Sequence, residues 1–137
     1  MLNKKLTVND VMLKKEQIPI VKPDFYLKEV IDLMNKSNLG CVCIINKKNK
    51  LKGIFTDGDL RRLLVKNQKP FSAFFTDDVL DHCSKKPITI LKNKSLKYAV
   101  KIMEKNSIWD LPVIDLNKNL VGLLHLHNAI KKVLKND

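Results

Sequence analysis

The sequence repeats itself once, and this repeat limits what the chain can fold into more than any other feature. When the chain is shifted by 69 positions, its two halves align without a gap. Apolar residues and glycines recur at matching positions: Leu27 with Leu96, Met34 with Met103, Ile45 with Ile114, Leu51 with Leu120, and Gly53 with Gly122. This unit is longer than the repeats of roughly 20–45 residues that stack into solenoids. We therefore predict two small copies of one supersecondary unit that share a core.

Each half is predicted to contain a strand, a helix, two further strands and a second helix. Apolar residues recur at helical spacing in the first helix, and the apolar runs that follow are typical of strands covered on both faces. A polar turn between the later strands predicts a hairpin. The expected elements are 18–21, 27–34, 39–45, 51–55 and 59–66, then 88–91, 96–103, 111–114, 120–124 and 128–134. The predicted fold class is α/β (α+β), with two β-α-β-β-α repeats related by pseudo-two-fold symmetry.

The predicted domain boundaries follow the repeat. They are 6–67 for the first copy, 68–75 for a linker and 76–135 for the second copy. A short helical start precedes each copy, because residues 7–10 have the spacing of a capping box and residues 76–78 are expected to cap in the same manner. The linker contains three phenylalanines that should hold it against the repeats: Phe71, Phe74 and Phe75.

Length and composition indicate a soluble globular protein. The chain has 137 residues, 45% of them hydrophobic, which is enough for a compact core. The apolar runs are far shorter than the ~20 residues of a membrane span, and the N-terminus lacks the apolar core of a secretory signal. We therefore expect a cytoplasmic location and no membrane partner. Cys41, Cys43 and Cys83 are expected to be reduced thiols, and a metal role for Cys41 and Cys43 is not expected.

The net charge of +12 raises the question of a nucleic-acid partner. The lysines are scattered through turns and along helix faces, whereas only Arg61 and Arg62 are arginines among the 26 basic residues. Specific nucleic-acid surfaces usually add arginine and exposed aromatic side chains. We therefore expect no nucleic-acid partner.

Residues 53–59 read G-I-F-T-D-G-D, and they end a predicted strand and open a predicted helix. With the repeat, this motif makes the chain resemble a tandem pair of CBS (cystathionine β-synthase) domains, whose ligand motif is G-h-x-T-x-x-D. The resemblance implies that the Thr56 hydroxyl contacts a ligand phosphate and that Asp59 binds ribose hydroxyls. A helix N-terminus favours an anion, and a carboxylate suits a vicinal diol, so the chemistry agrees with this assignment.

Other positions are also assigned to the ligand site. The resemblance assigns Ile18, Pro19, Asp57 and Pro112. Arg62 could hold a phosphate bidentately or lie on a solvated helix face, and the sequence leaves both open. For Trp109, which precedes an apolar strand, we favour packing over a ligand contact or a dimer contact.

The second copy departs from the motif, with His125 at the threonine position, His127 within the motif and Asn128 at the aspartate position. Asn128 can bond a hydroxyl without a charge, and His125 can meet a phosphate as a donor. The ligand cleft of the second copy is expected to hold a different ligand or none. Two histidines two residues apart are a weak metal signal, so no metal is expected. No catalytic residue is identified either, since His82 and Cys83 are adjacent and no third group accompanies them.

The two motifs, together with Asp10-Val11-Met12 at the start, resemble the C-terminal part of sugar-phosphate isomerases that act on D-arabinose 5-phosphate. Those enzymes join a SIS (sugar isomerase) domain to a CBS pair. The resemblance implies a non-catalytic regulatory part, excised from a longer chain, that forms homodimers and controls the SIS domain. Its expected ligand is AMP, ATP or a cytidine nucleotide-sugar, with no catalytic cofactor. The alternatives are a stand-alone adapter and a dimerisation module without ligand.

Overall fold

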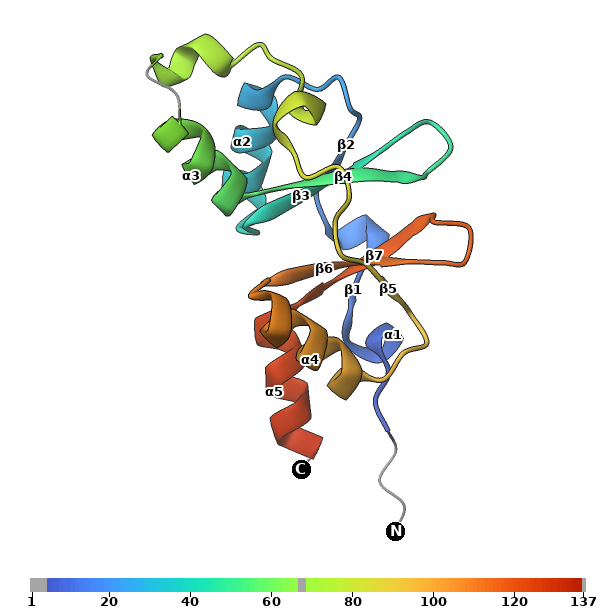
Figure 1. Ribbon diagram of the computed structural model, residues 1–137. Coiled ribbons are helices and arrows are strands. Elements are labelled where there is room, and N and C mark those ends of the chain that lie inside the picture. The colour runs from blue at the N-terminus through green and yellow to red at the C-terminus, as the bar shows by residue number, and fades with distance from the viewer. Residues whose placement is uncertain (1–4, 67–68, 137) are drawn as a thin grey trace. The chain divides into compact units, whose positions relative to one another are not determined.

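The computed structural model describes residues 5–66 and 69–136, and these form two compact units (Figure 1). The first, which we call the central unit, comprises Ile18–Pro87. The second, the terminal unit, comprises the residues up to Gln17 and those from Ile88 onward. The boundaries of the compact units therefore differ from those of the sequence repeats. The N-terminal segment up to Gln17 packs with the second repeat, and the segment that precedes the second repeat, up to Pro87, packs with the first.

The central unit contains a three-stranded sheet and two main helices. Its elements are β2 (Ile20–Val21), α2 (Leu27–Ser37), β3 (Cys41–Ile45), β4 (Leu51–Thr56) and α3 (Asp57–Lys66), followed by 3-10 turns η2 (Phe71–Phe74) and η3 (Val79–His82). The sheet order is β2-β3-β4, with β2 parallel and β4 antiparallel to β3. A core of buried side chains from both helices and one face of the sheet joins these elements: Val30 and Met34 of α2, Val42, Ile44 and Phe55 of the sheet, and Leu63 of α3.

The terminal unit contains a four-stranded sheet with α4 and α5 side by side against it (Figure 1). Its elements are α1 (Val8–Val11), β1 (Leu13–Lys14), η1 (Lys15–Gln17), β5 (Ile90–Leu91), α4 (Leu96–Asn106), β6 (Asp110–Ile114), β7 (Leu120–His125) and α5 (Leu126–Asn136). The sheet order is β1-β7-β6-β5. Strand β1 pairs antiparallel with β7, with Lys14 opposite Gly122. The N-terminal segment thereby adds a strand to the sheet of the second repeat.

The predicted repeat and fold class are confirmed. Helices α2 and α4 each have 11 residues, and the bounds of both hairpins shift by the same interval as the sequence. The backbone repeats as well, because α2 and α4 both end at a residue in the left-handed region, Asn38 with φ 58° and Ser107 with φ 55°. The hairpin turns use this region at Asn49 and Lys118.

Two expectations about helix starts are wrong. Helices α3 and α5 begin at Asp57 and Leu126, two residues before the predicted starts, because the strand leads directly into the first turn. Residues 76–78 do not cap as predicted. The residue before η3 is Asp78, whose side chain makes no capping hydrogen bond, and Asp77 instead accepts from the N–H of Leu27 through its backbone carbonyl, at 2.9 Å.

The linker phenylalanines pack as expected. Phe74 is buried in the core of the central unit, and Phe71 packs against that core. Phe71 and Phe75 meet edge to face, with their ring centroids 5.1 Å apart. The described part of the linker is therefore anchored to the core of the central unit, of which it is a part. Residues 67 and 68 lie outside the described residues.

Two further observations concern disulfide bonds and membrane-spanning helices. Among the described residues, Cys41, Cys43 and Cys83 form no disulfide. Within residues 5–66 and 69–136, no helix has the length and apolar character needed to cross a membrane.

Candidate functional site

The candidate site is built at the corner where β4 ends and α3 begins, which we call the first corner. Thr56 is the last residue of β4, and Asp59 lies in the first turn of α3. The Thr56 backbone N–H donates to Asp59 Oδ2 at 2.8 Å, and the Thr56 hydroxyl donates to the same oxygen at 3.1 Å. The Asp59 N–H in turn donates to Thr56 Oγ1 at 3.2 Å. These reciprocal bonds form a capping box, which fixes both side chains at the helix N-terminus.

Arg62 completes the first corner. Its Nη2 lies 2.7 Å from Asp59 Oδ1, with the Arg62 side chain 54% exposed and the Asp59 side chain 9% exposed. The carboxylate therefore holds the guanidinium of a half-exposed side chain at the start of α3. Gly58 lies beneath these groups, since a Cβ there would be 3.2 Å from Arg62 Nη1 and 3.5 Å from Thr56 Oγ1. A hydroxyl donor and a cation thus converge over a backbone without a side chain, an arrangement that suits a phosphate.

A second capping box in the chain shows which part of this geometry is merely structural. At α1, the Thr7 backbone N–H and hydroxyl donate to Asp10 Oδ2 at 2.9 and 3.1 Å. The lengths of these two bonds agree with those of the first corner to within 0.1 Å. The Thr-x-x-Asp spacing by itself therefore serves as a helix cap. What the first corner adds is Arg62 and the glycine at position 58.

Ile18 and Pro19 lie near the first corner by strand register. Ile20 pairs with Cys43, and Cys41 pairs with Thr56. Because β2 and β3 run parallel, Ile18 lies at the same end of the sheet as Thr56. Ile18 is 8% exposed, and the Pro19 carbonyl accepts from the Cys43 N–H at 3.1 Å.

The equivalent corner of the terminal unit, where β7 leads into α5, has different chemistry. His125 Nδ1 lies 2.8 Å from Asp110 Oδ1, and the Asp110 side chain is 7% exposed. His127 is exposed and stands at the position of Gly58, so an imidazole replaces the open backbone. Asn128 stands at the position of Asp59, and Pro112 is buried in the central strand β6. This second corner therefore lacks the donor cradle of the first.

Sequence reasoning missed Asp110. We expected the strand to begin at Leu111, whereas β6 begins at Asp110, directly opposite His125 in the register. The signal was present in the repeat, because Asp110 replaces Cys41, a residue in an apolar run. Among the described residues, no group of three or more histidine, cysteine or acidic side chains could hold a metal ion.

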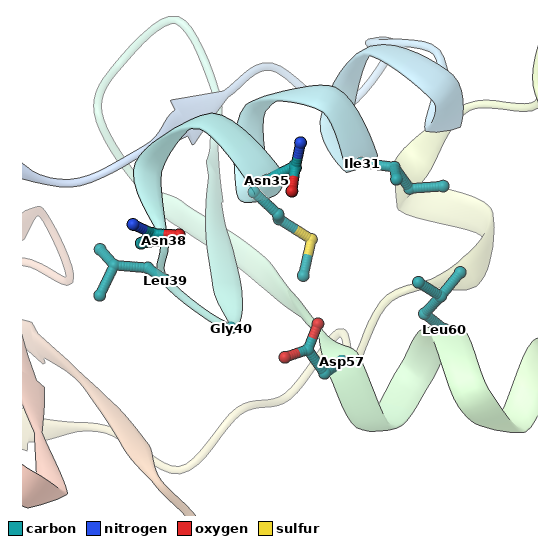
Figure 2. Close-up of a pocket in the computed structure, with 8 residues that line it drawn as sticks. Ile31, Asn35, Asn38, Leu39, Gly40, Asp57 and Leu60 are labelled. Atoms are coloured by element: carbon teal, nitrogen blue, oxygen red, sulfur yellow. The ribbon is translucent and has the colours of Figure 1, made fainter.

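A hollow of about 300 Å³ lies between α2 and α3 in the central unit. Figure 2 shows Asp57 and Leu60 of α3 on the side of that helix that faces α2, from which Ile31 also lines the hollow. Asp57, which we assigned to the ligand site, therefore faces this hollow rather than joining the bonds of Thr56 and Asp59. Gly40 also lines the hollow, and its backbone carbonyl accepts from the Asp57 N–H at 2.9 Å.

The expected packing of Trp109 is wrong. The side chain is 69% exposed, although it precedes the buried strand residue Leu111. Its backbone carbonyl accepts from the Leu126 N–H at 2.8 Å, so the main chain is fixed while the indole projects outward. The burial of the neighbouring strand residues therefore does not predict whether the Trp109 side chain is buried.

Cys83 gives the first corner a titratable neighbour. Burial raises the pKa of the Cys83 thiol, and the Asp59 carboxylate raises this pKa further. The folded chain then holds the thiol proton more tightly than the unfolded chain, so stability should fall as the pH rises above the ordinary thiol pKa. Urea unfolding of the unmodified chain and of Cys83→Ser, measured from pH 7 to pH 10.5, checks this. The unmodified chain should lose more stability with alkali, and parallel pH profiles would contradict the prediction.

The sequence matches the CBS domain family twice, over residues 8–66 and 77–135. The chain therefore belongs to the CBS domain family. It is 34% identical over 134 residues to the arabinose 5-phosphate isomerase KdsD of Francisella tularensis, covering 95% of this chain and 38% of that protein. The chain thus spans about two fifths of the length of the curated relatives it matches.

Solved structures agree on the fold. The chain is similar to Arabidopsis thaliana CBSX2 in complex with AMP, with 25% identity, a TM-score of 0.83, and coverage of 95% of this chain and 97% of that one. It is also similar to the CBS pair of protein MJ0100 in complex with 5′-methylthioadenosine and S-adenosyl-L-methionine. That match has 20% identity, a TM-score of 0.80, and coverage of 96% and 98%.

Proposed function

We propose that this chain is a regulatory module that binds a nucleotide, with the ligand phosphate at the first corner. The observation that carries the proposal is the convergence of the Thr56 hydroxyl and the Arg62 guanidinium over Gly58, at the N-terminus of α3. The positive end of the helix dipole adds to the attraction for an anion. The AMP complex of CBSX2 supports an adenine nucleotide as the ligand.

In this proposal each side chain contacts or positions a different part of the nucleotide. Arg62 donates to the phosphate through the guanidinium nitrogens that do not meet Asp59. Asp59 holds Arg62 in place, and rotation of the Thr56 hydroxyl toward the phosphate leaves the carboxylate free to accept from a ribose hydroxyl. Ile18 and Pro19 lie at the same end of the sheet and provide apolar surface for the base.

Ligand binding then regulates an attached isomerase domain by population shift. A ligand that prefers one arrangement of the module changes how an attached domain is held, by as much as its affinities for the two arrangements differ. The likeness to KdsD over 95% of this chain supports an arabinose 5-phosphate isomerase as the attached domain. The alternative is an adapter that regulates a separate protein. The full open reading frame distinguishes the two, because an attached isomerase domain would be encoded in the same frame as this segment.

Calorimetric titration tests the binding proposal. We expect AMP to release measurable heat and adenosine, which has no phosphate, to bind at least about tenfold more weakly, since a charged hydrogen bond contributes roughly 1.5–3 kcal/mol. AMP affinity should also fall with added salt. ATP, CMP and a cytidine nucleotide-sugar complete the series, and the last of these tests the ligand that the isomerase resemblance suggests. No heat from any of them would overturn the proposal.

A further inference from the structure

The residues ahead of the central unit form a short arm that docks on the terminal unit. We call residues 7–17 the N-terminal arm, which contains α1, β1 and η1 (Figure 1). Val8 of α1 is fully buried in the core of the terminal unit, and its N–H donates to the Lys94 carbonyl at 2.9 Å. Strand β1 then pairs with β7 through two residues. The arm is thus docked by a small set of contacts, and elements held in this way open locally more readily than a core strand does.

The arm is joined to the central unit by a crossing with little slack. Lys14 ends β1, and the three residues of η1 lie between it and Ile18, which opens the central unit. The Lys14 N–H donates to Gln17 Oε1 at 2.8 Å, so the crossing is closed on itself by a hydrogen bond. A 3-10 turn advances only about 2 Å per residue. The crossing therefore leaves little length to absorb a shift of Ile18 before it reaches β1.

Beyond the crossing, the chain enters the proposed nucleotide site. Ile18 is buried, and the Pro19 carbonyl accepts from the Cys43 N–H at 3.1 Å. Strand register places Ile18 and Pro19 at the same end of the sheet as Thr56. One short stretch of chain thus carries the docked arm at one end and the apolar surface for the base at the other.

We propose that the N-terminal arm and the nucleotide stabilise each other through this crossing. The inference rests on the proposed function, in which the base packs against Ile18 and Pro19. A docked arm restricts the motion of these two residues before the ligand arrives, so binding costs less conformational entropy. By linkage, a bound nucleotide strengthens the docking of the arm by the same factor. A domain attached ahead of the arm is then held through a docked arm when the nucleotide is bound.

Hydrogen exchange followed by mass spectrometry tests the effect of the nucleotide on the arm. Saturating AMP should slow the exchange of the arm amides by at least about fivefold, which is the low end of typical coupling factors. The last turn of α4 is the control, because the arm bonds to Lys94, just before that helix, whereas α4 ends at Asn106. Exchange in this last turn should not change.

Reciprocity gives a second measurement. Val8→Asp places a carboxylate in an apolar core and should release the arm, since an unpaired buried charge is costly. AMP affinity should then fall by the same factor by which AMP slows arm exchange in the unmodified chain. Met103→Ala is the control: it removes a fully buried side chain near the end of α4, and so destabilises the terminal unit without touching the bonds of the arm. This variant should bind AMP as the unmodified chain does.

An insertion separates coupling through the crossing from coupling by another route. Gly-Ser-Gly placed between Gln17 and Ile18 keeps the arm and the first corner intact and adds slack between them. AMP should still bind to this variant, but the exchange of the arm should no longer respond to it. A response that persists after the insertion would overturn the inference, as would a folded Val8→Asp that binds AMP with unchanged affinity.

The nucleotide proposal and this inference fail in different ways. No heat from AMP would overturn both. Heat from AMP together with unaltered exchange of the arm would overturn this inference alone. The exchange measurement uses the unmodified chain, so it decides the inference even where Val8→Asp does not fold.

Discussion

Asp59→Ala is expected to weaken AMP binding by roughly 10- to 100-fold, because the substitution removes a charged hydrogen-bonding group from the first corner. Asp59 holds Arg62 at 2.7 Å and accepts two hydrogen bonds from Thr56. Without the carboxylate, the guanidinium loses its fixed position, and the hydroxyl loses the acceptor that orients it. Calorimetry with AMP measures the loss.

The chain provides its own matched control in the capping box of α1. Asp10→Ala removes a carboxylate with nearly the same bonds to a threonine, so it should cost a similar amount of stability, about 1 kcal/mol. It should leave AMP affinity unchanged. Urea unfolding of both variants verifies that their stabilities are comparable. Equal AMP affinity in Asp59→Ala and Asp10→Ala would mean that the Thr-x-x-Asp motif at the first corner is only a helix cap, and the nucleotide proposal would fail.

The main elements of the fold could be predicted because they depend on local periodicity. The spacing of Leu27, Val30 and Met34 specifies one buried face of α2, and all three side chains are buried. Helix starts are harder to predict: the sequence pattern places the start of α3 at Asp59, whereas the helix begins at Asp57 and Asp59 lies in its first turn. The pairing of β1 with β7 could not be predicted, because a two-residue strand has no periodicity and its partner is more than 100 residues away in sequence.

The candidate site was predictable only in part. The motif indicated Thr56 and Asp59, whose side chains do meet. It did not indicate that Arg62 pairs with Asp59, which depends on the side-chain rotamers of two residues on one helix, nor that Asp110 meets His125, which depends on strand register. Trp109 shows the same limit at the surface. Apolar character predicts burial on average, but this side chain follows the left-handed turn at Ser107 and precedes the strand, where neighbouring elements do not cover it.

Gly122→Ala is expected to destabilise the chain by about 2 kcal/mol, within the 1–3 kcal/mol typical of overpacking. An added Cβ would lie 2.5 Å from the Leu13 carbonyl oxygen and 2.8 Å from Met12 Sδ. Backbone has little room to yield here, since Leu13 and Lys14 are held in the β1–β7 pairing. The expected fall in Tm is roughly 6–10 °C, which thermal unfolding followed by circular dichroism measures.

Gly40→Ala is the matched control for this prediction. Its Cβ would lie 2.7 Å from Asp57 Oδ2, but that atom is the end of a side chain that can rotate away. The same chemical change should therefore shift the stability by less than about 1 kcal/mol. Hydrogen exchange should locate the damage in Gly122→Ala at β1 and at the part of β7 that pairs with it. Equal Tm values for Gly122→Ala and Gly40→Ala would contradict the prediction. They would mean that the close approach of β1 to Gly122 does not constrain the fold of the terminal unit.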